Sequence, residues 1–287
     1  MIFQSLFSLV QKVFSCNYRF CLFLRRLSNF IPRHLRSSNR FTSLSSGSNC
    51  ADAEILHHPQ KVVVVLGMHR SGTSLLTGTL QEAGLVLGDV VTSAPHNRKG
   101  NREALPIRAL HDDLLDRSGG AWNQPPSQVV WEPIHLSFRD VLIDGYRGEA
   151  CWGFKDPRSL FCLQGWLDAL PQLQPVAIVR HPEAVARSLQ ARERMPMNDG
   201  LELWRIYNLK LLYWMERMDI PLLHFGSDLD LFCDHASSLI NELGLPHRLS
   251  SQSLQFPDPK LQNQSSSGLP LPPDIEGLYC DLLRRCL

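Results

Sequence analysis

The chain has 287 residues, with 29 Lys and Arg against 28 Asp and Glu, so its formal net charge at pH 7 is +1. This length is sufficient for one α/β domain with a sizeable core plus tails, and the balanced charge gives no global reason to expect nucleic-acid binding. The 8 cysteines and 11 histidines are scattered without the spacing of a zinc site, so we expect free thiols, a reducing compartment and no bound metal.

Residues 1–55 differ in composition from the rest of the chain. No Asp or Glu precedes Asp52, while arginine and serine are frequent among Phe and Leu. This composition is typical of an organelle transit peptide, and a helix on a membrane surface or a functionless extension from an upstream start site are the alternatives. The apolar runs Ile2–Val10 and Phe20–Leu24 are too short to cross a bilayer, so we expect no transmembrane segment. We therefore expect a disordered or targeting-like tail over 1–55 and one domain over 56–287, with the cytoplasm as the default location.

The stretch 61–80 contains the strongest pattern in the chain. Val62–Leu66 is an unbroken apolar run, which predicts a short strand buried on both faces, as in a parallel sheet. A loop with two glycines follows over Gly67–Ser74, and apolar residues then recur at helical spacing. A strand, a glycine loop and a helix direct backbone N–H groups and a helix N-terminus at one point, which suits an anion.

The loop differs from the nucleotide P-loop in one position. Gly67 and Gly72 have the spacing of G-x-x-x-x-G-K-[ST], and Ser74 stands at the hydroxyl position. Thr73 occupies the lysine position, and the cation is instead Arg70, inside the loop. Loss of that lysine weighs against a kinase, whereas a guanidinium suits bidentate binding of a phosphate or sulfate.

The sequence Gly-Met-His-Arg-Ser-Gly-Thr-Ser of this loop resembles the 5′-phosphosulfate loop of the sulfotransferases that use 3′-phosphoadenosine 5′-phosphosulfate (PAPS). Within that family it is similar to the bacterial-type branch, whose loop carries arginine. The resemblance covers roughly residues 60–285 and implies an α/β, P-loop-like three-layer fold with a mostly parallel central sheet and helices on both faces. The order of strand, loop, helix and further strands supports the same fold independently. By this resemblance the cofactor is held by His69, Arg70, Ser71, Gly72, Thr73 and Ser74.

The segment Asn97–Glu103 resembles the N-x-K-G-x-x-E stretch of the same branch. Glu103 is therefore the candidate general base, because an acceptor hydroxyl must lose its proton as the sulfuryl group arrives. The alternative is an ordinary acidic residue at a helix N-terminus. His69 and His111 are rival bases; His69 is expected to shape the loop, and His111, two turns along the next helix, can simply be exposed.

Two later segments complete the resemblance. A short strand at Cys151–Phe154 leads into Lys155-Asp156-Pro157-Arg158, similar to the K-D-P-R segment of the branch. At the carboxyl edge of a parallel sheet, Lys155 and Arg158 are expected to stabilise charge or bind the acceptor, with Asp156 orienting them; the alternative is a surface turn with an internal ion pair.

The segment Pro175–Leu189 combines a strand, a His-Pro turn and a helix, and it resembles the 3′-phosphate-binding segment. Arg180 and Ser188 match by position, and they supply the cation and the hydroxyl that a phosphate needs. The glycine-rich C-terminal motif with which the cytosolic small-molecule enzymes also hold the 3′-phosphate has no clear match, which argues against that branch and leaves the contacts to the adenine and the 3′-phosphate incompletely assigned.

The remaining elements follow from periodicity and turn residues. We expect a short strand around Leu85–Leu87, a strand over 220–225, and an extended Ser/Gln/Pro-rich segment over 250–273. Residues 118–131 are loop-like and either cover the acceptor pocket or pack on the surface. Helices are expected at about 103–117, 132–146, 200–218, 228–243 and 275–287, so the Walker-B-like run Val141–Asp144 is assigned to a helix.

The predicted function is transfer of a sulfuryl group from PAPS to a hydroxyl or amine acceptor, without a metal. The alternatives are a P-loop-type kinase or NTPase that uses Mg²⁺, and a sulfotransferase-like protein that binds nucleotide without turnover. Carbohydrate, lipid, peptide tyrosine and small phenol all remain open as acceptors, with carbohydrate favoured by family analogy alone. The oligomeric state is not predicted.

Overall fold

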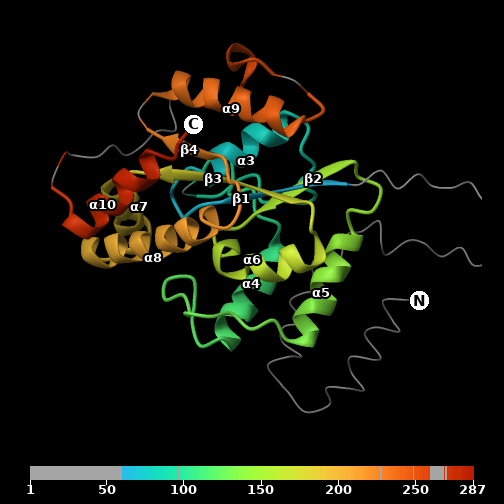
Figure 1. Ribbon diagram of the computed structural model, residues 1–287, viewed down its shortest axis with the longest axis horizontal. Coiled ribbons are helices and arrows are strands. Elements are labelled where there is room, and N and C mark those ends of the chain that lie inside the picture. The colour runs from blue at the N-terminus through green and yellow to red at the C-terminus, as the bar shows by residue number, and fades with distance from the viewer. Residues whose placement is uncertain (1–59, 96, 227, 248, 259–267, 269) are drawn as a thin grey trace, which may run out of the picture. The chain divides into compact units, whose positions relative to one another are not determined.

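The computed structural model describes residues 60–287 apart from positions 96, 227, 248, 259–267 and 269 (Figure 1). The expectations for the tail 1–55, and for part of the segment 250–273, therefore lie outside the described residues. Within the described ranges, no helix has the length and the apolar character needed to cross a membrane.

The centre of the domain is a four-stranded sheet. Its strands run in the order β2-β1-β3-β4, and every neighbouring pair is parallel. Their bounds are β1 Lys61–Leu66, β2 Cys151–Lys155, β3 Leu173–Arg180 and β4 Leu222–Phe225. The expected α/β fold with a parallel central sheet is confirmed.

Helices cover both faces of this sheet (Figure 1). They are α3 Thr73–Glu82, α4 Leu105–Arg117, α5 Pro133–Asp144, α6 Ser159–Ala169, α7 Pro182–Glu193, α8 Met197–Met215, α9 Leu229–Leu243 and α10 Pro273–Leu283, with a 3-10 turn η2 at Ser251–Ser253. Helices α3 and α9 cover one face, and α4, α6, α7, α8 and α10 contribute to the core on the other. Alternate residues of β1 follow this division, since Val63 and Val65 join the α3/α9 core whereas Val62, Val64 and Leu66 join the opposite one.

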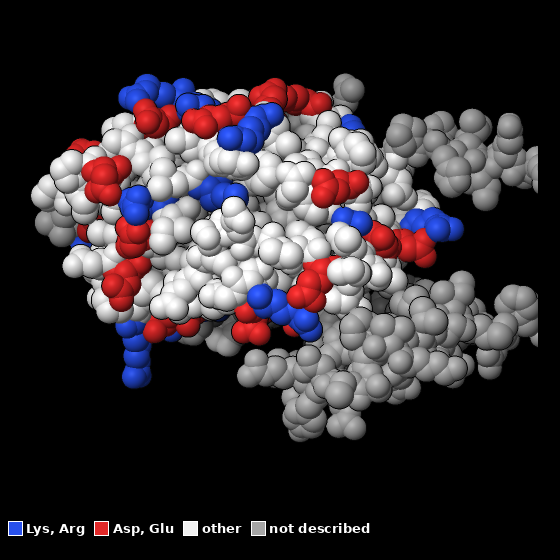
Figure 2. Space-filling view, turned by 60° about the horizontal axis from the view of Figure 1, so that its bottom comes forward, with Lys and Arg blue, Asp and Glu red and all other residues white. Residues whose placement is uncertain are grey.

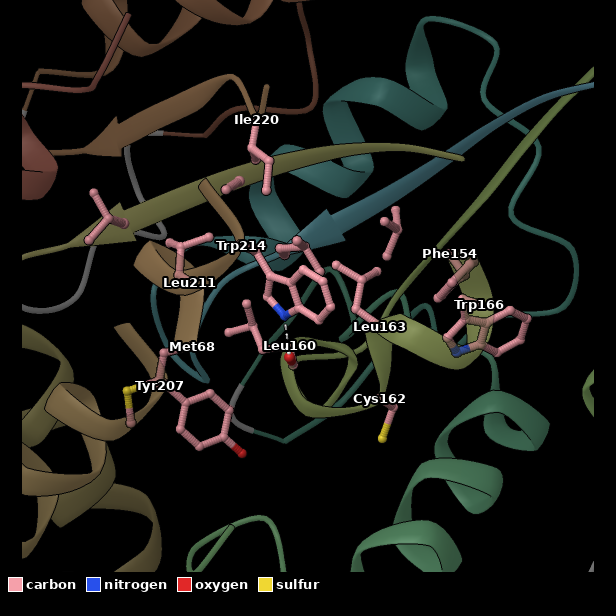
Figure 3. Packing of buried hydrophobic residues seen from close by; sticks show 14 of the residues in the cluster. Met68, Phe154, Leu160, Cys162, Leu163, Trp166, Tyr207, Leu211, Trp214 and Ile220 are labelled. Carbon is pink, nitrogen blue, oxygen red and sulfur yellow. Dashed lines mark hydrogen bonds between the residues drawn. The ribbon is translucent and has the colours of Figure 1, made fainter. Parts of the chain in front are cut away.

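The larger core contains the aromatic residues of α8, which were expected to be core (Figure 3). Tyr207 and Trp214 are buried, and the Trp214 indole Nε1 donates a hydrogen bond to the carbonyl of Leu160 at 2.8 Å. This bond satisfies the only polar atom of the indole and joins α8 to the first turn of α6.

Two elements differ from the expectations. Helix α6 was not anticipated, because Leu160, Cys162, Leu163 and Trp166 leave few positions for a polar face, and amphipathic periodicity is weak in such a helix. The expected strand around Leu85–Leu87 is only an isolated bridge between Val86 and Trp152. Gly84 and Gly88 flank it with φ angles of 98° and 69°, so the extended stretch is too short to continue the ladder.

The sheet order determines where a ligand site can form. Because β1 lies between β2 and β3, the loop after β1 has Lys155 on one side and Arg180 on the other, each the last residue of its strand. Ligands of open α/β sheets bind at such a carboxyl edge, where connections leave a central strand in opposite directions. Elsewhere, on the face that Figure 2 shows, acidic and basic side chains are interspersed, in keeping with the near-zero net charge.

Candidate active site

The loop after β1 adopts a conformation that glycine makes possible. Gly67 has φ 141°, and a Cβ atom there would lie 2.6 Å from the carbonyl oxygen of Ile178, so no side chain fits. Gly72 has φ 92° and caps the N-terminus of α3. Arg70 also has a positive φ, 65°, which costs conformational energy for a residue with a side chain. The loop therefore follows a tight path, and its one strained non-glycine residue is the predicted cofactor-binding arginine.

The start of α3 presents unpaired backbone donors. Among the described residues, the N–H groups of Gly72, Thr73 and Ser74 make no backbone hydrogen bond, as is usual for the first residues of a helix. Together with the helix dipole they favour an anion at this end. Ser71 differs from its neighbours, because its side chain is buried and its N–H donates to the Met68 carbonyl at 3.3 Å.

The two predicted phosphate-binding segments meet in space. The Arg70 side chain donates from Nε to Ser188 Oγ at 2.8 Å, across 118 positions of sequence. Arg180 donates from Nη1 to the Arg70 carbonyl oxygen at 3.1 Å. The corner after β3 and the start of α7 thus fix both the backbone and the side chain of the central loop residue.

The guanidinium groups of this cluster repel one another. Burial lowers the pKa of Arg180 to about 10, and the charge of Arg70 adds to the shift. Burial likewise lowers the pKa of Arg70, with a further contribution from the charge of Arg192. Cations brought together at low dielectric are stabilised by an anion, so the electrostatics of this corner favour a phosphate or sulfate ligand.

A cleft of about 690 Å³ opens over the loop. Of the residues predicted to bind the cofactor or to be catalytic, all except Ser71 contribute to its wall, whereas Asp156 lies behind it; Arg70, Arg180 and Ser188 therefore share one cavity with Glu103, Lys155 and Arg158. Further cations reach it from Arg98, Lys99, Arg108 and Arg192. A polar cleft with this excess of positive charge suits a polyanionic ligand.

Glu103 and Lys155 form a buried ion pair on one wall of the cleft. Lys155 Nζ lies 2.7 Å from Glu103 Oε1, and both side chains are less than 10% exposed. The same ammonium donates to the Asn101 carbonyl at 2.9 Å, and Ser74 Oγ donates to that carbonyl at 3.1 Å. The predicted base, the predicted cation and the loop hydroxyl are therefore joined through Asn101, a residue that the sequence had not singled out.

Arg158 is held by two carboxylates. Its Nη1 lies 2.9 Å from Asp156 Oδ1, and its Nε lies 2.6 Å from Asp112 Oδ1. Burial alone raises the pKa of Asp156, but Arg158 and His111 outweigh burial and hold that pKa well below its usual value, so Asp156 remains a carboxylate. The two predicted cations have different partners: Asp156 orients Arg158, and Glu103 orients Lys155.

The two histidines that rivalled Glu103 occupy different environments. His111 is completely buried, which rules out the exposed alternative, because α4 packs this side of the helix against α6 and the end of β2. His69 contributes to the cleft wall, between Trp122 and Tyr207, with ring centroids at 4.9 and 5.6 Å. The His69 Nε2 atom is buried and has no hydrogen-bond partner among the described residues. Burial and the charge of Arg158 keep its pKa well below the usual value, so His69 is neutral near pH 7.

The loop 118–131 contributes to both the cleft and the core, so it is not simply a surface loop. Trp122 lines the cleft, and its carbonyl oxygen accepts a hydrogen bond from the Tyr207 hydroxyl at 2.7 Å. Trp131 instead packs into the core, where its ring closely approaches Gly165. One end of this loop is therefore a cleft wall, and the other end is structural.

Phe256 is a cleft residue that the sequence did not identify. Its ring lies so close to Gly78 that a Cβ atom there would clash at 2.1 Å. The backbone N–H groups of Gln255 and Phe256 both donate to the Glu82 carboxylate at 2.9 Å, and Lys99 and Arg102 lie over the ring at 4.8 and 4.9 Å. The indication that the sequence offered for the contact with Gly78 was that Phe256 is the single aromatic residue of the Ser/Gln/Pro-rich segment 250–273.

Comparisons with known proteins concern the fold. No family model matches the sequence, and no curated protein matches it. Among solved structures, the chain is similar to a sulfotransferase domain from the curacin biosynthetic pathway, with 16% identity, a TM-score of 0.48, and coverage of 78% of this chain and 98% of that chain. The sulfotransferase domain of the Synechococcus PCC 7002 olefin synthase gives 18% identity, a TM-score of 0.45, and coverage of 78% and 95%. A sulfotransferase from Alicyclobacillus acidocaldarius gives 13% identity, a TM-score of 0.42, and coverage of 79% and 92%. At these identities and TM-scores the likeness is one of fold, and any functional assignment depends on the residues of the site.

The neutral state of His69 predicts a pH effect on stability. Its pKa is lowered in the folded chain, so below the unfolded-state value of about 6.5 the unfolded chain binds more protons and stability falls as the pH falls. His69→Phe and His69→Gln should both reduce this loss of stability between about pH 7.5 and 5.5, because neither new side chain titrates. Part of the dependence of stability on pH should remain, because the pKa values of His181 and His224 are also lowered. Urea unfolding of the full chain at several pH values measures the slope. An unchanged slope in both variants would contradict this account.

Proposed function

We propose that this chain transfers a sulfuryl group from PAPS to a hydroxyl or amine acceptor and releases 3′,5′-ADP. The observation that carries the proposal is the meeting of Arg70, Ser188 and Arg180 at the carboxyl edge of the sheet. PAPS carries anionic groups at both the 5′ and the 3′ positions of its ribose, so it needs two adjacent clusters of donors. The loop–α3 corner and the β3–α7 corner supply such clusters side by side.

The loop corner suits the 5′-phosphosulfate. The N–H groups of Gly72, Thr73 and Ser74 and the guanidinium of Arg70 would hold the oxygens of the phosphate and the sulfuryl group, with the Thr73 and Ser74 hydroxyls beside them. The β3–α7 corner, with Arg180 and Ser188, would hold the 3′-phosphate. His69 borders the cleft from within the loop, on the same wall as Trp122.

The reaction needs one bond formed and one broken at sulfur. The acceptor oxygen or nitrogen attacks the sulfur, and the bond from sulfur to the bridging phosphate oxygen breaks, with its electron pair remaining on 3′,5′-ADP. Donors that are fixed before the reaction stabilise this developing negative charge without reorganisation, and we assign this role to Arg70 and the loop N–H groups. The acceptor proton passes to the Glu103 carboxylate.

The Lys155 and Arg158 side chains serve the acceptor side of the cleft in this proposal. Lys155 holds one oxygen of Glu103 and thereby fixes the position of the base. Arg158 is positioned by Asp156 and Asp112 to stabilise charge on the transferring group or to bind a polar acceptor. The polar lining of the cleft favours a hydrophilic acceptor, so a carbohydrate hydroxyl is the first class to test.

Arg70→Ala tests the loop assignment. With radiolabelled PAPS and a panel of acceptors (a monosaccharide, an oligosaccharide, a phenol, a tyrosine peptide and a sterol), the full chain should label at least one acceptor without added Mg²⁺. Arg70→Ala should lower that rate by at least about 100-fold, because a preorganised transition-state donor is lost. Arg284→Ala removes an exposed arginine of the α10 C-terminus and should leave the rate unchanged. A wild-type rate in Arg70→Ala would contradict the proposed mechanism.

Glu103→Gln tests the base. The amide keeps the shape of the carboxylate but cannot accept the proton, so kcat should fall by about 100-fold or more while 3′,5′-ADP still binds. A matched control is Glu202→Gln, which alters an exposed carboxylate paired with Arg205 on α8. A melting curve of each variant accompanies the assay, since Lys155 loses its counter-charge. Undiminished turnover in Glu103→Gln would remove the glutamate from the mechanism.

A further inference from the structure

His111 is a buried titratable group that the proposed chemistry does not use. Its side chain is completely buried on α4, and it does not line the cleft. Its ring is in contact with polar atoms at both nitrogens: Trp166 Nε1 lies 2.9 Å from Nε2, and Asp156 Oδ2 lies 3.3 Å from Nδ1. A buried imidazole between two fixed polar partners has a defined orientation, and its position behind Arg158 calls for a physical explanation.

The Trp166 contact fixes the tautomer of the ring. An indole N–H is only a donor, so His111 Nε2 has to be the acceptor and carries no proton. In the neutral ring the proton is then on Nδ1, which faces Asp156 Oδ2. Trp166 is itself held in the core beside Phe154 (Figure 3), and their ring centroids are 4.5 Å apart.

Asp156 divides its two oxygens between His111 and Arg158. Oδ2 faces the imidazole, while Oδ1 accepts from the Arg158 backbone N–H at 3.0 Å and from its Nη1 at 2.9 Å. Neither His111 Nδ1 nor Asp156 Oδ2 makes a hydrogen bond among the described residues, so the 3.3 Å contact between them is electrostatic. Rotation of the carboxylate would break this contact and the bonds of Oδ1, so the imidazole beside Oδ2 restricts the oxygen that holds the arginine. Within the described part of the chain Nη2 of Arg158 makes no hydrogen bond, and the residue lines the cleft.

We propose that His111 is a positioning residue that acts through Asp156 to fix the Arg158 guanidinium at the cleft wall. The chain of contacts runs from the core, at Trp166, through His111 and Asp156 to a cation that faces the ligand. It restricts a long side chain to one orientation before substrate binds, which lowers the entropy lost in the transition state. The inference deepens the proposed function, on which it rests, by adding a residue behind the cleft to the catalytic machinery.

Two isosteric substitutions separate the two contacts of His111. His111→Asn keeps a donor near the position of Nδ1, facing Asp156, and loses the acceptor for Trp166. His111→Gln keeps an acceptor near the position of Nε2 and loses the ring N–H that faces Asp156. The proposal predicts that His111→Gln lowers kcat by about 10- to 100-fold, because the arginine is no longer held in its productive position. His111→Asn should keep at least about tenfold more of the activity than His111→Gln, and KM for PAPS should stay the same in both.

The assay uses the full chain, PAPS and the acceptor of the panel that gives the highest rate. Melting curves of both His111 variants show whether they fold. An equal loss in the two variants, or a larger loss in His111→Asn, would show a merely structural role and overturn the proposal. Failure of the wild-type chain to label any acceptor would instead count against the proposed function.

NMR then tests the positioning independently of turnover. The wild-type chain should carry its His111 proton on Nδ1, and its Arg158 Nη1–H, which donates to Asp156, should exchange slowly. That protection should persist in His111→Asn and be lost in His111→Gln. The opposite tautomer, or equal Arg158 protection in both variants, overturns the proposal. If neither variant folds, rapid exchange of the Arg158 Nη1–H in the wild-type chain overturns it.

Discussion

The site depends on the contact between the loop after β1 and the corner after β3. Arg70 reaches Ser188 with its side chain, and Arg180 reaches back to the Arg70 carbonyl. Two positively charged groups are thereby held close together. Burial and the charge of Arg70 lower the pKa of Arg180, and burial and the charge of Arg192 lower the pKa of Arg70. An anion that binds between the two arginines would reduce their repulsion and stabilise the folded chain. The placement of these charges thus connects the fold to the proposed PAPS site.

On the proposed acceptor side of the cleft, each predicted cation is matched by a carboxylate. Lys155 is matched by Glu103, and Arg158 is matched by Asp156 and Asp112. Buried pairs of this kind contribute little net stability, because desolvation offsets the attraction, but they determine where each group stands. In the proposed function, the arginines of the loop and of the β3–α7 corner bind a polyanion, and the oriented ion pairs of the other wall serve proton transfer.

The sequence predicted the parts of this site that local geometry determines. A valine strand followed by a glycine loop can hardly form anything other than a strand–loop–helix corner, so the placement of Arg70 and Ser74 followed from spacing, and Arg180 followed in the same way from the strand and His-Pro turn before α7. Helical spacing could have indicated the burial of His111, since it lies four residues from both Ile107 and Leu115 on the apolar face of α4. Its contacts could not be predicted, because they require α4 to pack against α6 and the end of β2. Phe256 was missed for the same reason, since its place against Gly78 depends on tertiary packing of a segment with no periodicity. Roles assigned to Glu103, Lys155 and the loop residues remain predictions for the experiments above.

The most direct measurement is the melting temperature of the full chain with 3′,5′-ADP, compared with 5′-ADP plus Mg²⁺. A ligand at about 100 times its dissociation constant stabilises the folded state by roughly 2.7 kcal/mol, which is readily measured. The account predicts stabilisation by 3′,5′-ADP without metal, and loss of that stabilisation in Arg180→Ala, because the 3′-phosphate loses its cation. Stabilisation by 5′-ADP with Mg²⁺ alone would contradict the account and assign the loop to a kinase or NTPase.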